Sequence, residues 1–117
     1  MTNDNCIFCH IASGEISTKK LFENDDFFII EDIAPVAKYH YLAIPKSHYP
    51  TLDTMENKDR EVLGSIFATI GTLTEKLSLQ NGYRLIINQG EDAGQTVFHL
   101  HIHIIAGQKM NFPHFKR

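Results

Sequence analysis

Three histidines alternate with aliphatic residues near the C-terminal end of the chain, in the stretch from His99 to Ile105. Because successive side chains of a β-strand point to opposite faces, this alternation predicts a strand over residues 98–105. His99, His101 and His103 then share one face, and the aliphatic residues between them face a core. Three imidazoles in a row are poor core material, because each needs a hydrogen-bond partner when buried. We therefore expect a functional site on the histidine face.

The composition is that of an ordinary globular protein. The chain has 117 residues, 43% of them hydrophobic and 21% charged, and its formal net charge is −3. This length fits a single domain, residues 1–117, with a real core. The lack of a basic patch argues against nucleic-acid binding, and no apolar run reaches membrane-spanning length. The first residues do not have the layout of a signal peptide, so we expect a cytoplasmic protein.

The two cysteines, Cys6 and Cys9, are separated by two residues. In a reducing compartment this spacing indicates a metal half-site or a redox pair before it indicates a structural disulfide. A zinc site of this kind needs two further ligands. The alternative is that both thiols pack as small hydrophobic side chains.

One longer helix is expected in the middle of the chain. Apolar residues recur at helical spacing from Val62 to Leu77, and Asn81-Gly82 closes the pattern. Asp53, with Glu56 three residues later, has the spacing of an N-cap pair.

The other expected elements are short. One or two helical turns are expected at residues 6–12. Four strands, rich in aromatic and β-branched residues, are expected at 20–23, 27–32, 39–44 and 83–88. Hairpin-length connections favour antiparallel pairing of the strands. Together these patterns predict an α+β fold, with an antiparallel sheet of about five strands, one long helix and a short N-terminal helix.

Two kinds of chemistry fit the histidine face on residue types alone. Alternate imidazoles on one face of a strand can bind a metal ion, as in catalytic zinc sites. A neutral imidazole, with an ordinary pKa of about 6.5, can instead act as a nucleophile. Phosphorus suits such a nucleophile, because the loop Gly94-Gln95-Thr96 offers backbone N–H groups, an amide and a hydroxyl to phosphoryl oxygens. The third possibility is that the histidines are structural and hydrogen-bonded on a half-exposed face.

The stretch from His99 to Ile105 resembles the signature of the histidine triad (HIT) family of nucleotide-binding proteins. Further segments resemble the Hint branch of that family, the purine nucleoside phosphoramidases; they are Cys6–Cys9, Glu31–Pro35, His40–Lys46, Gly82–Arg84, Asn88–Gly90 and Gly94–Phe98. The resemblance covers residues 5–113 and implies a HIT-like fold. It also implies hydrolysis of the P–N bond in purine nucleoside 5′-phosphoramidates or related nucleoside monophosphate conjugates.

The resemblance implies a role for each catalytic position. His101 resembles the nucleophile that attacks the α-phosphorus, forming a transient nucleotidyl-histidine that water then hydrolyses. His103 resembles the phosphate-contacting histidine that helps to stabilise or protonate the leaving side. His40 resembles the supporting histidine beside the triad.

The resemblance also implies which residues bind the nucleotide. Asn88, Gln95, Thr96 and the backbone N–H of Val97 correspond to groups around the phosphate, and the family usually has serine in place of Thr96. Asp32 resembles the ligand of the ribose hydroxyls. The apolar slot for the purine corresponds to Ile7, Phe8, Ile11, Ile30 and Ile33, for which plain core packing is the alternative.

A structural zinc ion is implied as well. Several bacterial members of the family, and the related galactose-1-phosphate uridylyltransferases, hold zinc on two cysteines and two histidines. The matching positions here are Cys6, Cys9, His48 and His99, and no organic cofactor is implied. His10, next to Cys9, is a rival ligand.

The resemblance further implies a homodimer that meets through the long helix and the strand at 83–88. Small residues, Gly64, Ala68 and Gly71, lie on one side of that helix, which fits close approach of a partner but also fits chance. Hint proteins often carry a tryptophan in a C-terminal segment that reaches the partner's active site. This chain has no tryptophan, and Phe112-Pro113 stands in that region, so the leaving-group preference stays open.

Three other functions remain as alternatives. A dinucleoside polyphosphate hydrolase uses the same chemistry, although the Gly-Gln-Thr loop and the Cys-x-x-Cys pair favour the phosphoramidase. A nucleotide-binding regulatory module would hydrolyse its ligand only incidentally. A metallohydrolase with a His₃ site would lose activity on chelation while keeping its fold.

Overall fold

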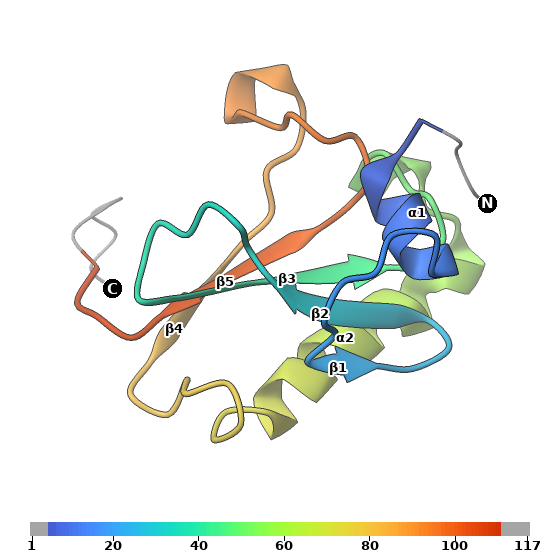
Figure 1. Ribbon diagram of the computed structural model, residues 1–117. Coiled ribbons are helices and arrows are strands. Elements are labelled where there is room, and N and C mark those ends of the chain that lie inside the picture. Colours follow the sequence, from blue (N-terminus) through green and yellow to red (C-terminus); the bar gives the residue numbers. More distant parts are fainter. Residues whose placement is uncertain (1–4, 111–117) are drawn as a thin grey trace.

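The structure is a computed structural model, and it describes residues 5–110. Five strands form one antiparallel sheet in the order β1–β2–β3–β5–β4 (Figure 1). Two α-helices and three short 3₁₀ helices accompany the sheet. The bounds of the strands and α-helices are β1 (Phe22–Glu23), β2 (Phe27–Glu31), β3 (Tyr39–Pro45), β4 (Tyr83–Ile86), β5 (Ile102–Ala106), α1 (Ile7–Ser13) and α2 (Arg60–Thr72). The predicted α+β fold, with five antiparallel strands, one longer helix and a short N-terminal helix, is confirmed.

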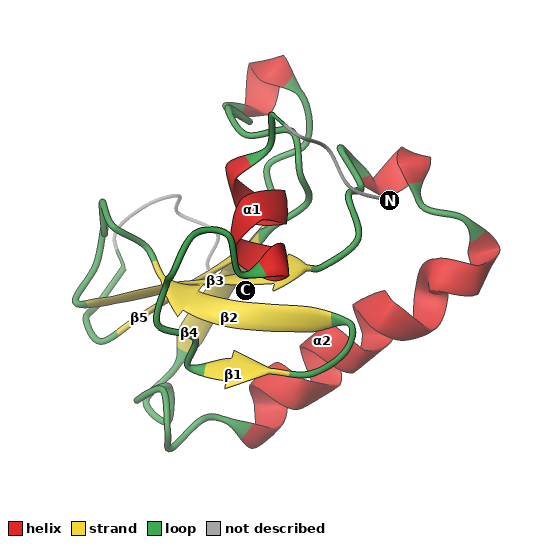
Figure 2. Cartoon of the chain, turned by 45° about the vertical axis from the view of Figure 1, so that its right-hand side comes forward, coloured by secondary structure: helices red, strands yellow, loops and turns green. Residues whose placement is uncertain are grey.

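The sheet has two different faces, and a helix lies on each of them (Figure 2). One face packs against α2 in a hydrophobic cluster that includes Ile29, Ile66, Ile70, Ile102 and Ile104. The other face packs against α1 in a smaller cluster that includes Phe8, Ile11, Phe28, Ile30 and Ile44. Because side chains alternate along a strand, one set of strand residues builds each cluster.

The α1 face continues toward the histidines. In the antiparallel pairing of β3 with β5, Leu42 lies opposite His103 and His40 lies opposite Ile105. Leu42 belongs to the α1 cluster, so His40 and His103 extend that face beyond its apolar part. The two central strands therefore position the site.

The predicted strand over residues 98–105 is only half right. Strand β5 begins at Ile102, and the backbone N–H of Leu100 donates to Tyr49 O at 2.6 Å instead of to a neighbouring strand. The alternation of side chains nevertheless persists, because Leu100, Ile102 and Ile104 are all fully buried. His99 and His101 thus sit on an extended segment that leaves the sheet.

The predicted start of the long helix is wrong. Asp53 lies in a 3₁₀ turn (Leu52–Thr54), a second turn follows (Asn57–Asp59), and α2 begins at Arg60. The carboxylate of Asp59 accepts hydrogen bonds from the backbone N–H of Glu56 at 2.9 Å and from the Tyr49 hydroxyl at 2.7 Å. These bonds anchor the start of the helix at Asp59 rather than at Asp53.

The predicted end of the long helix is also wrong, because α2 ends at Thr72 and turns follow to residue 81. Leu77 and Leu79 are both buried, 2% and 1% exposed. Residues two positions apart point to opposite sides of a helix, so irregular turns are needed to bury both side chains. The Tyr41 hydroxyl also donates to Leu77 O at 2.8 Å, which ties these turns to the sheet.

Smaller differences concern strand ends. β1, β2 and β4 are shorter than expected at 20–23, 27–32 and 83–88, although the backbone N–H groups of Leu21 and Asp32 still donate to Ile29 O and His40 O. Pro45, expected to stop β3, is its last residue. The expectation about Phe112-Pro113 lies outside the described residues.

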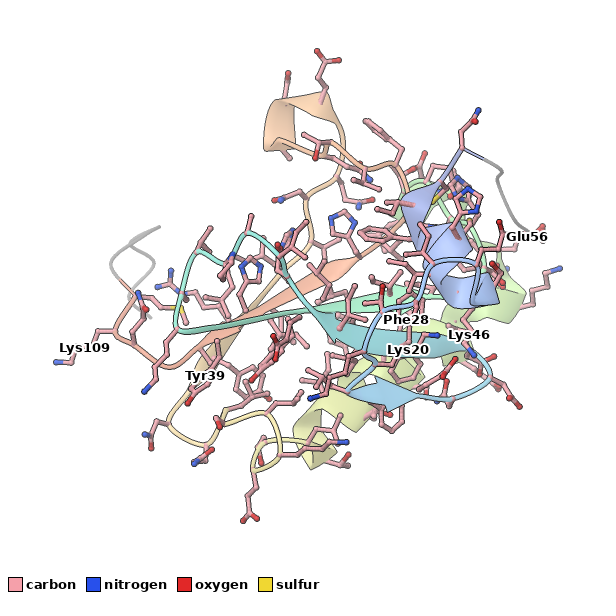
Figure 3. All side chains as sticks on the ribbon, viewed as in Figure 1. Lys20, Phe28, Tyr39, Lys46, Glu56 and Lys109 are labelled. Carbon is pink, nitrogen blue, oxygen red and sulfur yellow. The ribbon has the colours of Figure 1, made fainter. Side chains whose placement is uncertain are left out.

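Two lysines contact the first two strands of the sheet. The Lys46 ammonium pairs with the Glu23 carboxylate at 2.8 Å, and the Lys20 ammonium lies 5.7 Å from the centroid of the Phe28 ring (Figure 3). No helix in the described part of the chain is long and apolar enough to cross a membrane.

Two histidine clusters at the candidate active site

The structure gathers the predicted site residues into two clusters. The cysteine cluster comprises Cys6, Cys9, His48 and His99, and the aspartate cluster comprises Asp32, His40 and His103. Within each cluster, the side-chain atoms that could bind a metal lie within 4.8 Å of one another. His101 lies between the two clusters in sequence, and its ring lies 5.1 Å from the ring of His103.

The cysteine cluster brings together three segments that are distant in the sequence, around Cys6 and Cys9, His48 and His99. Cys6 Sγ lies 3.2 Å and Cys9 Sγ lies 3.6 Å from His99 Nδ1. Cys9 Sγ also lies 3.3 Å from His48 Nδ1, and the two histidine Nδ1 atoms are 3.2 Å apart. Both cysteines are buried and no disulfide joins them.

These separations fit a tetrahedral zinc site. Zinc bonds of about 2.3 Å to sulfur and about 2.0–2.1 Å to nitrogen give S···N edges of about 3.6 Å and N···N edges of about 3.3 Å. The four measured edges lie within a few tenths of an ångström of these values. The donor set of two thiolates and two imidazoles is also one that zinc prefers.

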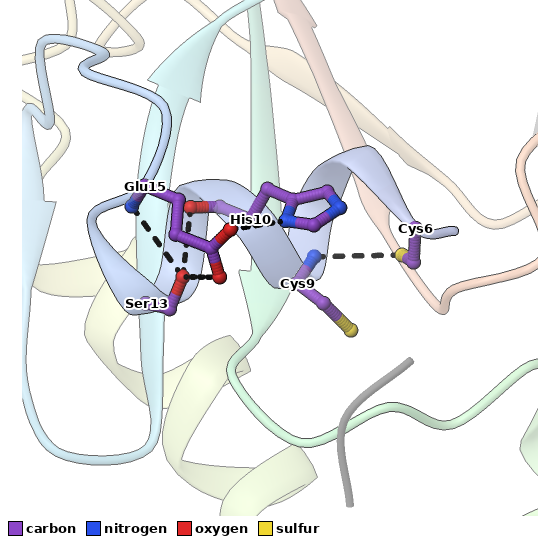
Figure 4. Close-up of polar contacts among 5 residues, drawn as sticks. All are labelled: Cys6, Cys9, His10, Ser13 and Glu15. Carbon is purple, nitrogen blue, oxygen red and sulfur yellow. Dashed lines mark hydrogen bonds and ion pairs between the residues drawn. The ribbon is translucent and has the colours of Figure 1, made fainter. Parts of the chain in front are cut away.

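Hydrogen bonds orient the ligands of this cluster. The Nε2–H group of His99 donates to Pro45 O at 2.7 Å, which leaves the lone pair of its Nδ1 facing the cysteines. The backbone N–H of Cys9 donates to Cys6 Sγ at 3.4 Å, so the sulfur also caps α1 (Figure 4). A bond like that from His99 Nε2–H to a carbonyl oxygen is typical of a histidine whose other ring nitrogen binds a metal ion.

The rival ligand His10 points elsewhere. Its Nδ1 lies 3.1 Å from the carboxylate of Glu15, as Figure 4 shows. The residues grouped around the two sulfurs are instead His48 and His99. Burial lowers the pKa of His99 to about 4 and also lowers the pKa of His48, so both rings stay neutral near pH 7.

The aspartate cluster has different geometry. His40 Nε2 lies 2.9 Å from His103 Nδ1 and 3.3 Å from Asp32 Oδ2, and His103 Nδ1 is 4.0 Å from the same oxygen. The backbone N–H of Val36 donates to His40 Nδ1 at 3.1 Å. Neutral His40 therefore carries its proton on Nε2, the atom that a metal would need. In the aspartate cluster the inward-facing nitrogen of His40 therefore carries a proton, whereas in the cysteine cluster the inward-facing nitrogen of His99 carries a lone pair.

His101 is oriented by the backbone of a neighbouring residue. Its Nδ1–H group donates to His99 O at 2.7 Å, because a carbonyl oxygen can only accept. The lone pair of neutral His101 is therefore on Nε2, which is the nitrogen free to attack an electrophile. The ring of Phe8 lies edge-on to it, with the ring centroids 5.2 Å apart.

The residues that are predicted to bind the phosphate differ in how exposed they are. Ile86, the last residue of β4, lies opposite His103, and Asn88 follows two residues after the end of that strand. Thr96 is exposed, and Val97 is half-buried beside α1.

Gln95, in contrast, is 5% exposed and is turned into the protein. Its side-chain N–H groups donate to Pro50 O and Val97 O, and its oxygen accepts from the backbone N–H of Gly90. Its amide braces the loop and is already fully used by hydrogen bonds.

The residues of the predicted purine slot also divide. Phe8, Ile11 and Ile30 are buried in the α1 cluster, which is the core packing considered as the alternative. Ile7 is 49% exposed and Ile33 is fully exposed. The structure therefore leaves two of the five apolar side chains open to a ligand.

The resemblance to the family implies a backbone carbonyl that holds the middle imidazole, but the sequence could not show which backbone groups fix the imidazoles here. They are the carbonyls of Pro45 and His99, which accept from His99 and His101, and the N–H of Val36, which donates to His40. Backbone groups carry no residue-type signal, so only the folded arrangement shows them.

Comparison with known proteins identifies the family. The family model described as "Scavenger mRNA decapping enzyme C-term binding" matches residues 5–114. Protein HitA of Neisseria gonorrhoeae is 38% identical over 102 residues, covering 87% of this chain and 95% of that protein.

Solved structures agree with this match. A histidine triad protein from Clostridium difficile superposes with a TM-score of 0.90 at 40% identity, covering 99% of this chain and 100% of the other. A HIT family hydrolase from Legionella pneumophila gives 0.87 at 38% identity, covering 93% and 98%. A zinc-bound histidine triad family protein from Mycobacterium smegmatis gives 0.77 at 31% identity, covering 96% and 81%. With this fold, this arrangement of histidines and these matches, the chain belongs to the histidine triad family.

Proposed function

We propose that this protein is a nucleoside phosphoramidase of the Hint branch, which cleaves the P–N bond of purine nucleoside 5′-phosphoramidates. The observation that carries the proposal is the fixed tautomer of His101, whose Nδ1–H bond to His99 O leaves a lone pair on Nε2. A neutral imidazole held in this way is ready to act as a nucleophile without first losing a proton. Similarity to a HIT family hydrolase supports an enzymatic role.

The proposed reaction has two steps. His101 Nε2 attacks the α-phosphorus, a P–N bond to the enzyme forms, the substrate P–N bond breaks, and the departing amine takes a proton. His103, whose ring lies beside that of His101, is proposed to donate a hydrogen bond to the leaving side. The proton that the amine takes comes from solvent, to which the attacking water returns one in the second step. Water then attacks the nucleotidyl-histidine, which releases the nucleoside monophosphate and restores neutral His101.

The phosphate oxygens require hydrogen-bond donors as charge develops in the transition state. We assign this task to the Asn88 amide, the Thr96 hydroxyl and the backbone N–H of Val97. Gln95 does not fit the role of phosphate ligand, because its amide is committed inside the protein. Its proposed role is to hold the loop that presents Thr96 and Val97.

The nucleoside would lie toward the other end of the site. Asp32 is the proposed ligand of the ribose hydroxyls, and the exposed side chains of Ile7 and Ile33 would contact the purine. A hollow of about 510 Å³, lined in part by Ile7, Thr96 and Val97, opens beside the phosphate loop and offers room for part of the substrate.

We assign a structural zinc ion to Cys6, Cys9, His48 and His99. The edge lengths of the cluster and the similarity to a zinc-bound family member support this assignment. When bound, zinc would cross-link α1 to the segment that carries the three histidines. The His99 side chain lies in this cluster while its carbonyl orients His101, so the metal site also supports the geometry of the nucleophile.

A homodimer is the proposed assembly. β4 is an edge strand of the sheet, and Phe67 of α2 and Tyr83 of β4 are exposed aromatic residues, 40% and 37% accessible. A Cβ atom placed at Gly64 would meet nothing within 4 Å, so this side of α2 is open to a partner. Sedimentation equilibrium on the wild type beside Phe67→Glu tests the assignment, since a charge at a paired face would produce monomers.

The test of the activity is turnover of an adenosine 5′-phosphoramidate by the wild type, by His101→Ala and by His10→Ala. His101→Ala should lower kcat by at least about 10³-fold. His10→Ala removes an imidazole that lies outside both clusters and should leave kcat unchanged. Zinc content on the same samples, expected at about one ion per chain in all three proteins, separates loss of the nucleophile from loss of the metal.

A folded wild type that binds AMP but does not hydrolyse the phosphoramidate would refute the phosphoramidase and favour the nucleotide-binding module. Faster hydrolysis of a dinucleoside polyphosphate than of the phosphoramidate would favour that alternative enzyme.

A further inference from the structure

A backbone amide controls the protonation of His40. The N–H group of Val36 donates to His40 Nδ1 at 3.1 Å, and the His40 side chain is almost completely buried. Since a backbone N–H can only donate, His40 Nδ1 must offer a lone pair. Neutral His40 then has a single possible tautomer, with its proton on Nε2.

The same proton fixes the next ring. His40 Nε2 lies 2.9 Å from His103 Nδ1, and Asp32 Oδ2 lies 3.3 Å from the same His40 nitrogen. Because His40 Nε2 is the donor in this contact, His103 Nδ1 must be the acceptor. Neutral His103 therefore carries its own proton on Nε2.

The loop that supplies the Val36 amide is held in place at both ends. Asp32 Oδ1 accepts from the backbone N–H of Ala34 at 2.8 Å, and the backbone N–H of Asp32 donates to His40 O at 2.9 Å. The first bond is an Asx turn, which closes the chain just before Val36. The loop is thus anchored to β3 next to the ring that it orients.

A second proton on His40 would disrupt this arrangement. It would have to sit on Nδ1, where it would face the N–H group of Val36. Asp32 and His103 are the titratable groups in contact with the His40 ring, and the Asp32 charge favours the protonated form. Burial nevertheless dominates and lowers the pKa of His40, and it lowers the pKa of His103 to about 4.

We propose that the backbone amide of Val36 is a positioning group that acts through His40 to make His103 a neutral Nε2–H donor. His101 and His103 are then opposite tautomers, one with a lone pair on Nε2 and the other with a proton there. One ring can attack phosphorus while the other can donate a hydrogen bond to the leaving group. The effect on turnover rests on the proposed function, whereas the tautomers do not depend on it.

The test removes the amide hydrogen and keeps the rest of the loop. In Val36→Pro the donor is lost, and in Val36→Ala it is kept while the exposed side chain is shortened. A third protein has an ester in place of the peptide bond at residue 36, which removes only the N–H group and serves if the proline variant does not fold. Imidazole ¹⁵N chemical shifts of His40 and His103 in the full-length, zinc-loaded protein report the tautomers directly.

In the wild type and Val36→Ala, we expect both rings to be Nε2–H tautomers between pH 6 and 9. In Val36→Pro or the ester, His40 should become a mixture of tautomers and its pKa should rise, because Nδ1 is then free to bind a proton. Phosphoramidate turnover should fall about tenfold in kcat, with KM changed less, since only the donor is disordered.

A wild-type His103 with its proton on Nδ1 would overturn the proposal, as would an ester variant whose shifts match those of the wild type. A wild type that shows the expected tautomers but no turnover would refute the proposed function and leave the positioning role of Val36 intact.

Discussion

The cysteine cluster and the aspartate cluster are built from similar groups, but the first is suited to bind a metal ion and the second to hold a proton. Each gathers two imidazoles with one or two acidic side chains within 4.8 Å. In the cysteine cluster, the outer nitrogen of His99 donates to a carbonyl, which turns a lone pair inward. In the aspartate cluster, the outer nitrogen of His40 accepts from an amide, which turns a proton inward. The partner of the second ring nitrogen therefore decides whether a histidine can hold a metal or a proton.

The distances follow the same division. The two Nδ1 atoms in the cysteine cluster are 3.2 Å apart, close to the edge of a zinc tetrahedron. The corresponding nitrogens of His40 and His103 are 2.9 Å apart, which is a hydrogen-bond length. The Val36 N–H group places the His40 proton between these two nitrogens, so only the cysteine cluster turns lone pairs toward a metal ion, although residue types alone would nominate both.

The strongest effect is expected from removing both sulfurs. Cys6→Ser with Cys9→Ser should abolish zinc binding and lower the free energy of unfolding by roughly 5 kcal/mol or more, because the proposed metal joins three separate segments. Denaturant unfolding together with metal analysis measures both quantities. Asp32→Asn, in the other cluster, should retain zinc. Equal zinc loss in both variants would contradict the claim that only the cysteine cluster binds zinc.

A change in the aspartate cluster should affect turnover more than stability. His103→Asn should lower kcat for a phosphoramidate about 10²-fold, because a positioned hydrogen-bond donor to the leaving side is removed. Zinc content should not change. Steady-state kinetics with metal analysis checks this, and a variant with normal kcat but depleted zinc would assign His103 to the wrong cluster.

The pH dependence of stability should carry the signature of a buried neutral histidine. Burial lowers the pKa of His103 from 6.5 to about 4 in the folded state, so between these values the unfolded state binds more protons. The stability from neutral His103 is complete above pH 6.5 and is lost as the pH falls toward 4. In zinc-loaded His103→Asn the free energy of unfolding should therefore decline less steeply over that range than in the wild type. Parallel curves would contradict the buried neutral ring.

The smallest effect is expected from neutralising the aspartate. Asp32 raises the pKa of both His40 and His103 against the larger effect of burial. In Asp32→Asn both pKa values should therefore fall slightly, and the free energy of unfolding should change by no more than about 1 kcal/mol. NMR titration of the two rings measures the shift, and a rise in either pKa would show that the carboxylate is not the charge that they sense.

Much of the fold was accessible from the sequence because it rests on local periodicity. The alternation around His101 predicted which side chains are buried, and the aromatic and β-branched runs predicted the sheet. The errors came where tertiary contacts override local pattern. Asp59, held by Tyr49, starts α2 in place of Asp53, and burial of both Leu77 and Leu79 breaks the helical pattern.

The sequence by itself determined which residue types meet at the site. The alternation of the histidines predicted a shared face, because side-chain direction follows from the backbone period, and the spacing of Cys6 and Cys9 indicated a metal half-site or a redox pair. Only the tertiary structure decided what each imidazole does. The hydrogen bonds that orient His99, His101 and His40 come from backbone groups brought together by folding. A ring nitrogen becomes a ligand, a nucleophile or a donor according to that partner, and no pattern of side chains encodes it.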